Sequence, residues 1–439
     1  MLPFGKSLPM LESLYFDNLI SHIKQSFEQI PDSRSALNST KPLSDALLSA
    51  FAVFVLKDRS LLQFIERLKE RSANLQNIFK ITTALSDTAV RQIIDPVDTK
   101  ELKTVLHQPV GLLLREGVLK PYQFLYHYLL VAIDGTGYFR SPYVHCKNCC
   151  ERQHRDGTAT YYHNALCAVI VKPGEREVFP VAMEEITRQD GAIKNDGELA
   201  AVKRLLPQLA KALAAAGFVL TEDALFCNGP HIKEVQTAGL HFIIRIKEGF
   251  PLLQFESLLK EGAVQTFKVS AGSTKQVYQY VNALMLSGAH QDVTVNFLRY
   301  REVNSKTGAV LFEADWITDL DLTEHTVVEV AKGGRARWKI ENETFNTLKN
   351  QGYQFEHNFG HGHENLCTNF ALLMMLAFLT DQIQQRVNRL FHLALSEQKR
   401  LIRLWEKVRE VFDMVCCNSM ETIYKIIAKQ LKLKIEIIT

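Results

Sequence analysis

The chain has 439 residues, of which 46% are hydrophobic and 23% charged, the balance of a globular protein with room for two or three domains. Its 51 basic and 48 acidic residues give a formal net charge of +3, too small to indicate a polyanionic partner from composition alone. No N-terminal pattern predicts secretion. The most apolar run, residues 370–379, is too short to cross a bilayer and predicts a core helix, so we expect a cytoplasmic protein with no membrane partner. Eight cysteines in such a chain favour reduced thiols.

The first 120 residues show apolar residues at helical spacing. Helices are predicted over residues 18–29, 43–56 and 60–71. Ser86 is a candidate N-cap for a further helix over residues 87–94, which Pro96 ends. This short helix is similar to the second helix of a small DNA-binding unit, but plain scaffolding explains it nearly as well.

From residue 126 the pattern becomes that of an α/β sheet. A continuous apolar run over residues 126–133 predicts a strand buried on both faces, which ends at Asp134 with a turn at Gly135. Further strands are predicted over residues 159–171, 178–183, 217–222 and 241–247. A helix capped by Asp196 and kinked at Pro207 is predicted over residues 197–215, and another over residues 231–237.

This order of elements predicts which strands are neighbours. Three strands, a helix, a strand, a helix and a strand make the first and fourth strands parallel, and right-handed crossover places them side by side. Asp134 and Asp223 then meet at one edge of the sheet. Glu222 is the rival of Asp223, because successive strand residues face opposite ways and only one of the two can face Asp134.

Residues 251–320 are rich in predicted strands and turns and indicate an antiparallel insertion. The chain then passes through Gly333 and Gly334 into a helix that Gly352 can end, and residues 361–439 are helical again. Trp316 is predicted to lie in the core.

The helix after the glycine pair carries a stripe of Trp338, Glu341, Phe345 and Leu348, which predicts that these four side chains are buried. A buried carboxylate is costly unless it is paired or holds a metal. Arg337, one turn earlier, is one possible partner of Glu341. The other interpretation is a divalent-metal site that Glu341 shares with the acids at the strand ends.

Three acids, on two strand ends and a later helix, form the arrangement of RNase H-like nucleotidyl transferases. The sequences around these acids and between them include AIDGTGYF, TEDALFCN, RWKIENETFNTLKNQGY with EHNFGHG, CKNCCERQHRDGTATYYH and KNDGELAAVKRLL. These segments resemble the DDE transposases of bacterial insertion sequences, in the branch with a β-rich insertion between the second and third acids. The resemblance covers residues 31–382.

The resemblance implies an α/β fold, an RNase H-like mixed sheet with flanking helices. It implies five parts: a helical N-terminal domain (1–120), the first part of the catalytic core (121–250), a β-rich insertion (251–320), the second part of the core (321–384) and a basic helical region (385–439). The implied partners are transposon-end DNA and target DNA, bound by a homodimer in the bacterial cytoplasm at the nucleoid.

For the chemistry, the resemblance implies that Asp134, Asp223 and Glu341 are catalytic and hold two Mg²⁺ or Mn²⁺ ions roughly 3.5–4 Å apart. One ion activates water or a DNA 3′-hydroxyl, and the other stabilises the leaving oxygen. Cleavage at the element's ends is followed by joining to target DNA. Taken singly, each of Asp134 and Asp223 is better explained as a turn former at a strand end; taken together with Glu341 in a buried stripe, the metal site is the better explanation. A DNA-binding protein that has lost catalysis, and a structure-specific nuclease on the same fold, remain alternatives.

In this family the third acid lies in a pattern of Tyr, two residues, Arg, three residues, Glu, six residues and Lys. Arg337 and Glu341 match it, but Gly334 stands at the Tyr position. Lys349 comes one residue late, which on an α-helix turns its side chain by about 100°. The DNA-binding candidates are Arg335, Arg337, Lys339 and Lys349. Residues 385–439 carry eleven Lys/Arg against six Asp/Glu, which DNA and a solvated helix face explain equally well.

A separate cluster of cysteines and histidines follows the first predicted strand. Cys146 and Cys149 have C-x-x-C spacing, which makes a structural zinc site one interpretation, although the spacing alone is weak. Further ligands lie close in sequence: His145, Cys150, His154 and His163. Helix-cap or core roles are expected for His357, His361 and His363.

Overall fold

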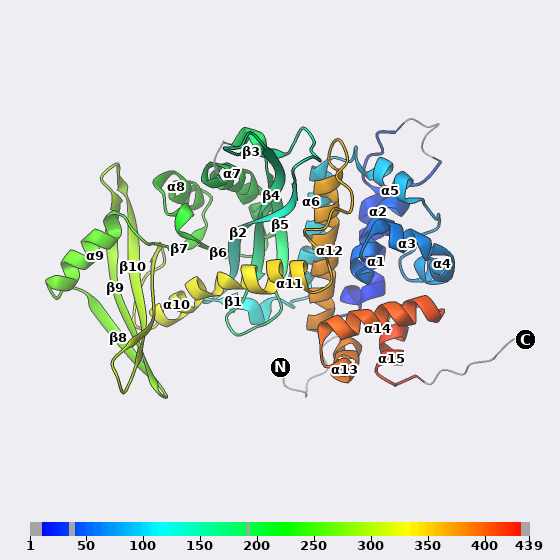
Figure 1. Ribbon diagram of the computed structural model, residues 1–439. Helices are drawn as coiled ribbons and strands as arrows, with labels where there is room; N and C mark the ends of the chain where they lie inside the picture. The colour runs from blue at the N-terminus through cyan, green and yellow to red at the C-terminus, as the bar shows by residue number, and fades with distance from the viewer. Residues whose placement is uncertain (1–10, 35–39, 191–193, 432–439) are drawn as a thin grey trace, which may run out of the picture.

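The computed structural model describes residues 11–34, 40–190 and 194–431 (Figure 1). Its strands are β1 (Gln123–Phe124), β2 (Tyr128–Ser141), β3 (Cys150–Gln153), β4 (Ala159–Val171), β5 (Phe179–Ile186), β6 (Phe218–Glu222), β7 (His241–Arg245), β8 (Gln265–Ala271), β9 (Thr274–Ser287), β10 (His290–Asn304) and β11 (Val310–Thr318). Its longer helices are α1 (Phe16–Glu28), α2 (Leu43–Leu56), α3 (Leu61–Glu66), α4 (Leu68–Asn77), α5 (Asp87–Ile94), α6 (Thr99–Arg115), α7 (Lys194–Ala212), α8 (Gly229–Thr237), α9 (Phe250–Lys260), α10 (Val327–Ala336), α11 (Asn346–Asn350), α12 (Leu366–Val387), α13 (Arg389–Gln398), α14 (Leu401–Met414) and α15 (Met420–Ile427).

One mixed sheet organises the described chain, with strand order β3-β4-β2-β6-β7-β11-β10-β9-β8, β5 beside β4 and β1 beside β2. Strands β2, β6 and β7 are parallel, and β4 pairs antiparallel with β2. The central strands are buried on both faces, as their continuous apolar sequences predict. The predicted RNase H-like sheet with flanking helices is therefore confirmed, including the parallel pairing of the first and fourth predicted strands.

The antiparallel strands predicted within residues 251–320 are present, as β8 to β11, and they continue the core sheet. Strand β11 pairs with β7, with Trp316 opposite Arg245, so the antiparallel strands β8 to β11 extend the core sheet. In Figure 1 this extension reaches away from the helical part of the molecule, with α9 packed on β9 and β10. Helix α9, within the segment predicted to be rich in strands, was not predicted.

Helix α12 stands between the sheet and the N-terminal helices, in contact with α2, α6 and β5 (Figure 1). By length and composition it could cross a membrane, which the shorter apolar run in the sequence did not indicate, but its whole apolar window is buried inside the fold. The prediction of a core helix is therefore confirmed, and the apolar content of α12 is explained by its place at the centre of the molecule.

The N-terminal and C-terminal helices form one helical lobe. The predicted helix over residues 60–71 is divided at Arg67 into α3 and α4. Helix α4 then packs on α14, where Arg71 forms an ion pair of 2.5 Å with Asp413 and the Asn74 amide donates a 2.7 Å hydrogen bond to the Phe412 carbonyl. Helix α5 begins after Ser86, whose hydroxyl accepts a hydrogen bond from the Ala89 N–H, as predicted.

Two predicted boundaries near the sheet are wrong. Strand β2 continues through Asp134 and Gly135, because the long strand β4 pairs with it there, with Cys167 opposite Asp134. Helix α7 begins at Lys194, so Asp196 lies inside its first turn and not at its N-cap; the Asp196 side chain is outside the described residues.

The glycine pair also lies elsewhere than predicted, because α10 begins at Val327 and Gly333 and Gly334 are inside it. A Cβ at Gly333 would overlap Phe124, and one at Gly334 would overlap the Trp316 indole. The two glycines therefore let the helix approach the sheet closely.

Candidate active site

The register of the parallel strands β2 and β6 places Asp134 and Asp223 at the same position along the strand direction. Leu129 lies opposite Phe218, a difference of 89 residues, and the same difference separates Asp134 from Asp223. Glu222 faces the other side of the sheet, where its buried carboxylate accepts a 2.9 Å hydrogen bond from His231 Nε2 on α8. Of the two rivals, Asp223 is therefore the one on the side of Asp134.

Asp223 also has a local role that its sequence position alone explains. Its carboxylate accepts a 2.9 Å hydrogen bond from the Leu225 N–H and so caps the short 3₁₀ turn Ala224–Phe226. The turn-forming interpretation is thus correct for Asp223, while for Asp134, inside a continuing strand, it is wrong. One oxygen of a capping carboxylate remains able to accept further contacts.

The helix with the third acid is not the regular α-helix expected. Between α10 and α11 the residues Ile340–Phe345 form a π-helical turn, which holds one residue more than an α-turn. Phe345 and Leu348 are buried as predicted, but the Trp338 side chain is 59% exposed and Glu341 is 47% exposed. The predicted buried stripe is therefore wrong in its first half, where Ile340 is buried instead.

Arg337 links the first and third acids. Its guanidinium donates a 2.8 Å hydrogen bond to Asp134 Oδ2 and forms a 3.0 Å ion pair with Glu341 Oε1. The predicted pairing of Arg337 with Glu341 is present, and the same arginine reaches the sheet. The side chains of Arg337 and Asp134 are 15% and 16% exposed, so this contact is largely shielded from water.

Asp134 is held in an environment that disfavours its charge. Burial raises its pKa to about 7, Arg337 opposes the rise, and the neighbouring Glu341 carboxylate adds to it. A further cation near this carboxyl group would stabilise its ionised form. The candidate site thus consists of the desolvated Asp134, Asp223 after the neighbouring strand, and Glu341 on an exposed helical turn.

A cavity of about 620 Å³ opens beside Asp223 and Arg337. Its walls come from the turn after β6, from β7 and β11, and from the helix of Arg337, and Asp223 is the acid among them. The basic residues that line it are Arg245, Lys247, Arg335 and Arg337, and the aromatic ones are Phe312, Trp316 and Trp338. Arg337 and Arg335 are already paired with carboxylates outside the lining, so Arg245 and Lys247, with the exposed indole, are the lining groups best suited to phosphates and bases.

The predicted DNA-binding residues take different places. Arg335 lines the cavity but is also bound to β10, by a 2.5 Å ion pair with Glu302. Lys339 is half-buried and is not among the cavity residues that the structure describes. Lys349 forms a 2.7 Å ion pair with Glu356.

The π-helical turn explains the late position of Lys349. The extra residue that the turn holds lies between Glu341 and Lys349 and offsets the one-residue delay, so the rotation expected on an uninterrupted α-helix is wrong. The absence of the family's tyrosine at Gly334 also has a cause, since Trp316 fills the space that a side chain there would need. Trp316 is buried as predicted.

Several basic residues of the C-terminal helices are already paired. Arg386 binds Glu175 at 2.9 Å, Lys407 binds Glu410 at 2.8 Å, and Arg409 donates to the Lys57 carbonyl at 2.8 Å. Four others are exposed: Lys399 and Arg400 in the turn between α13 and α14, Arg403 in the first turn of α14, and Arg389 at the start of α13.

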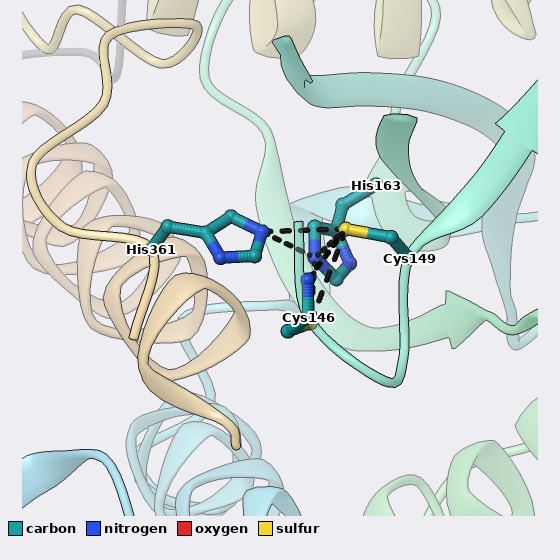
Figure 2. Close-up of side chains that lie close together, drawn as sticks. All are labelled: Cys146, Cys149, His163 and His361. Atoms are coloured by element: carbon teal, nitrogen blue, oxygen red, sulfur yellow. Dashed lines mark hydrogen bonds between the residues drawn. The ribbon is translucent and has the colours of Figure 1, made fainter. Parts of the chain in front are cut away.

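The cysteine and histidine cluster is assembled, with a different membership from the one predicted. Cys146, Cys149 and His163 lie together, and the fourth member is His361 from the loop before α12 (Figure 2). The neighbours in sequence, His145, Cys150 and His154, lie outside it. His361 is buried, as a core role predicts, but its partners are the cluster residues. His357 and His363 are exposed.

The comparisons with known proteins agree with this geometry. A family model described as "Transposase DDE domain" matches residues 181–379, which include Asp223 and Glu341 but not Asp134. No curated protein matches the chain. Together with the mixed sheet, this match identifies residues 181–379 as a transposase DDE domain.

Proposed function

We propose that this protein is a DNA transposase that binds the terminal repeats of its own insertion sequence, cleaves at the element's ends and joins the 3′-hydroxyl ends to target DNA. It would act as a homodimer on DNA in the bacterial cytoplasm, at the nucleoid. The observation that supports the proposal is that Arg337 joins Asp134 to Glu341 beside a basic cavity that Asp223 lines, in a chain whose residues 181–379 match a DDE domain.

The three acids supply the kind of donor atoms that a divalent-metal site needs. Asp134, Asp223 and Glu341 offer hard oxygen donors, and the raised pKa of Asp134 shows a buried carboxylate whose charge is not fully balanced. Bound there, two Mg²⁺ or Mn²⁺ ions would activate a water or 3′-hydroxyl and stabilise the leaving oxygen. In the metal-free protein, the Arg337 guanidinium offsets the charges of Asp134 and Glu341. Once metal ions take over that role, Arg337 would be free to bind a phosphate.

The DNA path in this proposal follows the cavity. Arg245, Lys247 and Arg335 would neutralise phosphates beside the acids, and the exposed Trp338 indole offers a face on which a base can stack. Lys349 would extend the same path along the helix, once released from Glu356. The exposed basic turn between α13 and α14 is a second surface for terminal DNA.

The test uses a supercoiled plasmid that carries the chain's own gene with its flanking DNA, because the terminal repeats of an insertion sequence flank its transposase gene. Purified protein with Mg²⁺ is expected to nick and then cut at the element's ends and to yield strand-transfer products. Asp134→Asn should abolish cutting but keep end binding, while Glu343→Gln, an acid on the same helix outside the site, should keep both.

Two outcomes would replace the proposal with its alternatives. Binding at the ends with no cleavage by the unmodified protein, in Mg²⁺ or Mn²⁺, would make it a DNA-binding protein of transposase descent. Cleavage that depends on DNA shape and never yields joined products would make it a nuclease.

A further inference from the structure

Four metal-type ligands from three distant segments meet at the end of the sheet beyond Asp134. Cys146 and Cys149 lie in the loop between β2 and β3, His163 is on β4, and His361 lies in the loop between α11 and α12 (Figure 2). Cys149, His163 and His361 are buried, and Cys146 is half-buried. Their donor atoms, two Sγ and two Nε2, lie within 4.8 Å of one another.

The spacing of these atoms matches a tetrahedral zinc site. Zinc bonds of about 2.3 Å to sulfur and about 2.0–2.1 Å to nitrogen, at tetrahedral angles, place two sulfurs about 3.8 Å apart, sulfur and nitrogen about 3.6 Å, and two nitrogens about 3.3 Å. The sulfurs of Cys146 and Cys149 are 3.9 Å apart, and the Nε2 atoms of His163 and His361 are 3.2 Å apart. Three of the four sulfur–nitrogen distances are 3.2, 3.3 and 3.5 Å.

Hydrogen bonds among the four groups do not explain the cluster. An imidazole nitrogen carries either one proton or one lone pair, so it makes one good hydrogen bond. His163 Nε2 nevertheless has three partners within 3.5 Å, in Cys146, Cys149 and His361. A single cation at the centre satisfies all four donor atoms at once.

The orientation of His361 supports the same conclusion. Its Nδ1 lies 3.1 Å from the Gly362 carbonyl, to which an Nδ1–H donates. That tautomer leaves the lone pair on Nε2, directed at the two sulfurs and His163, as in histidines whose second nitrogen is held by a carbonyl when the first binds a metal.

We propose that Cys146, Cys149, His163 and His361 bind one structural Zn²⁺ ion. Four protein ligands leave no open position, so the ion would not take part in the DNA chemistry. Its effect follows from the ligands' places in the chain: it ties the segment after the Glu341 helix to strands β2 and β4, and β2 carries Asp134. The zinc would thus help to set the distance between the first and third acids.

A hydrogen bond between the cysteine loop and the loop of His361 supports this link between the two segments. The Asn148 amide, between the two cysteines in sequence, donates to the Glu364 carbonyl at 3.1 Å, three residues beyond His361. The cysteine loop therefore already lies against the segment that the ion would fix.

The test is the metal content of the full-length protein, purified without chelators and measured by plasma mass spectrometry. One zinc per chain is expected, with Cys149→Ser and His361→Ala each reduced below about a fifth of that value. The matched controls are Cys150→Ser, the adjacent cysteine, whose sulfur faces the Ile186 carbonyl, and His363→Ala, an exposed histidine of the same loop. Both should keep one zinc, as should Asp134→Asn.

A second readout uses the unmodified protein, so that poor folding of a variant decides nothing. Titration with an organomercurial should release the zinc as two thiols react, and Co²⁺ in its place should show a thiolate charge-transfer band. The proposal is overturned if the protein, also after incubation with Zn²⁺ and dialysis, holds less than a tenth of an ion per chain. A Cys146–Cys149 disulfide in the purified protein, or equal zinc in the ligand variants and controls, would overturn it as well.

Discussion

Asp134→Asn is expected to make the metal-free protein more stable at pH 8. The folded-state pKa of Asp134 is about 7 and its ordinary value is 3.8, a difference of 3.2. The folded chain therefore holds a proton that the unfolded chain releases between these two values, and the free energy of unfolding falls as the pH rises through that window. At about 1.4 kcal/mol per pH unit, the loss amounts to about 4 kcal/mol at pH 8.

Asparagine is a neutral isostere of the protonated acid, so the variant avoids this loss. Its advantage over the unmodified protein should be about 2 kcal/mol at pH 5 and about 4 kcal/mol at pH 8. Urea unfolding at both pH values, with EDTA present, measures the difference. The exposed Asp321→Asn serves as the control and should change stability by less than about 0.5 kcal/mol at either pH.

With divalent cations present, the unmodified protein should be more stable than Asp134→Asn. Mn²⁺ at pH 8 is expected to stabilise the unmodified protein more than the variant, because it binds the ionised carboxylate in the folded state. If the variant is less stable than the unmodified protein at pH 8, or if its advantage does not grow with pH, the interpretation of Asp134 as a desolvated acid awaiting a cation fails.

Three further predictions concern packing and the cavity. Asp381→Leu should cost about 3–5 kcal/mol in urea unfolding, because it leaves the buried ammonium of Lys57 without its carboxylate; the double variant with Lys57→Met should recover much of the loss. Gly334→Tyr, which restores the family's tyrosine, should lower the melting temperature because the new side chain overlaps the Trp316 ring, and Trp316→Ala in the same chain should partly restore it; no recovery would refute the overlap. Trp338→Ala should leave the melting temperature unchanged, since the indole is exposed, but weaken binding of single-stranded end DNA by about 1–3 kcal/mol in fluorescence anisotropy; a lower melting temperature would contradict this.

The sheet was predictable from the sequence because its central strands are continuous apolar runs separated by helices, and crossover handedness then leaves few orders open. The level pairing of Asp134 with Asp223 followed from that rule alone. The continuation of β2 beyond Asp134 did not, because it depends on the partner strand β4 and not on the residues of the strand itself. An Asp-Gly pair that favours a turn stays in a strand where a long neighbouring strand supplies hydrogen-bond partners.

The third-acid helix and the cysteine cluster show where sequence patterns fail. A helical wheel assumes a constant turn, so the π-helical turn at Ile340–Phe345 moved Trp338 and Glu341 out of the buried stripe. His361 is 198 residues from His163 in sequence, and no spacing rule joins two such positions. The tandem of histidines at 361 and 363 was the signal present in the sequence, but nothing local distinguished the buried one from the exposed one.

The joining of β11 to β7 has a consequence for biosynthesis. Arg245 meets its partner Trp316 only 71 residues later in the chain, so during translation the outer edge of β7 has no strand beside it until the whole extension has left the ribosome. At about 5–20 residues per second, this interval is on the order of 4–14 s. An apolar strand edge exposed for that long invites pairing with other nascent chains, so we expect yield in cells to respond to chaperones and slow induction.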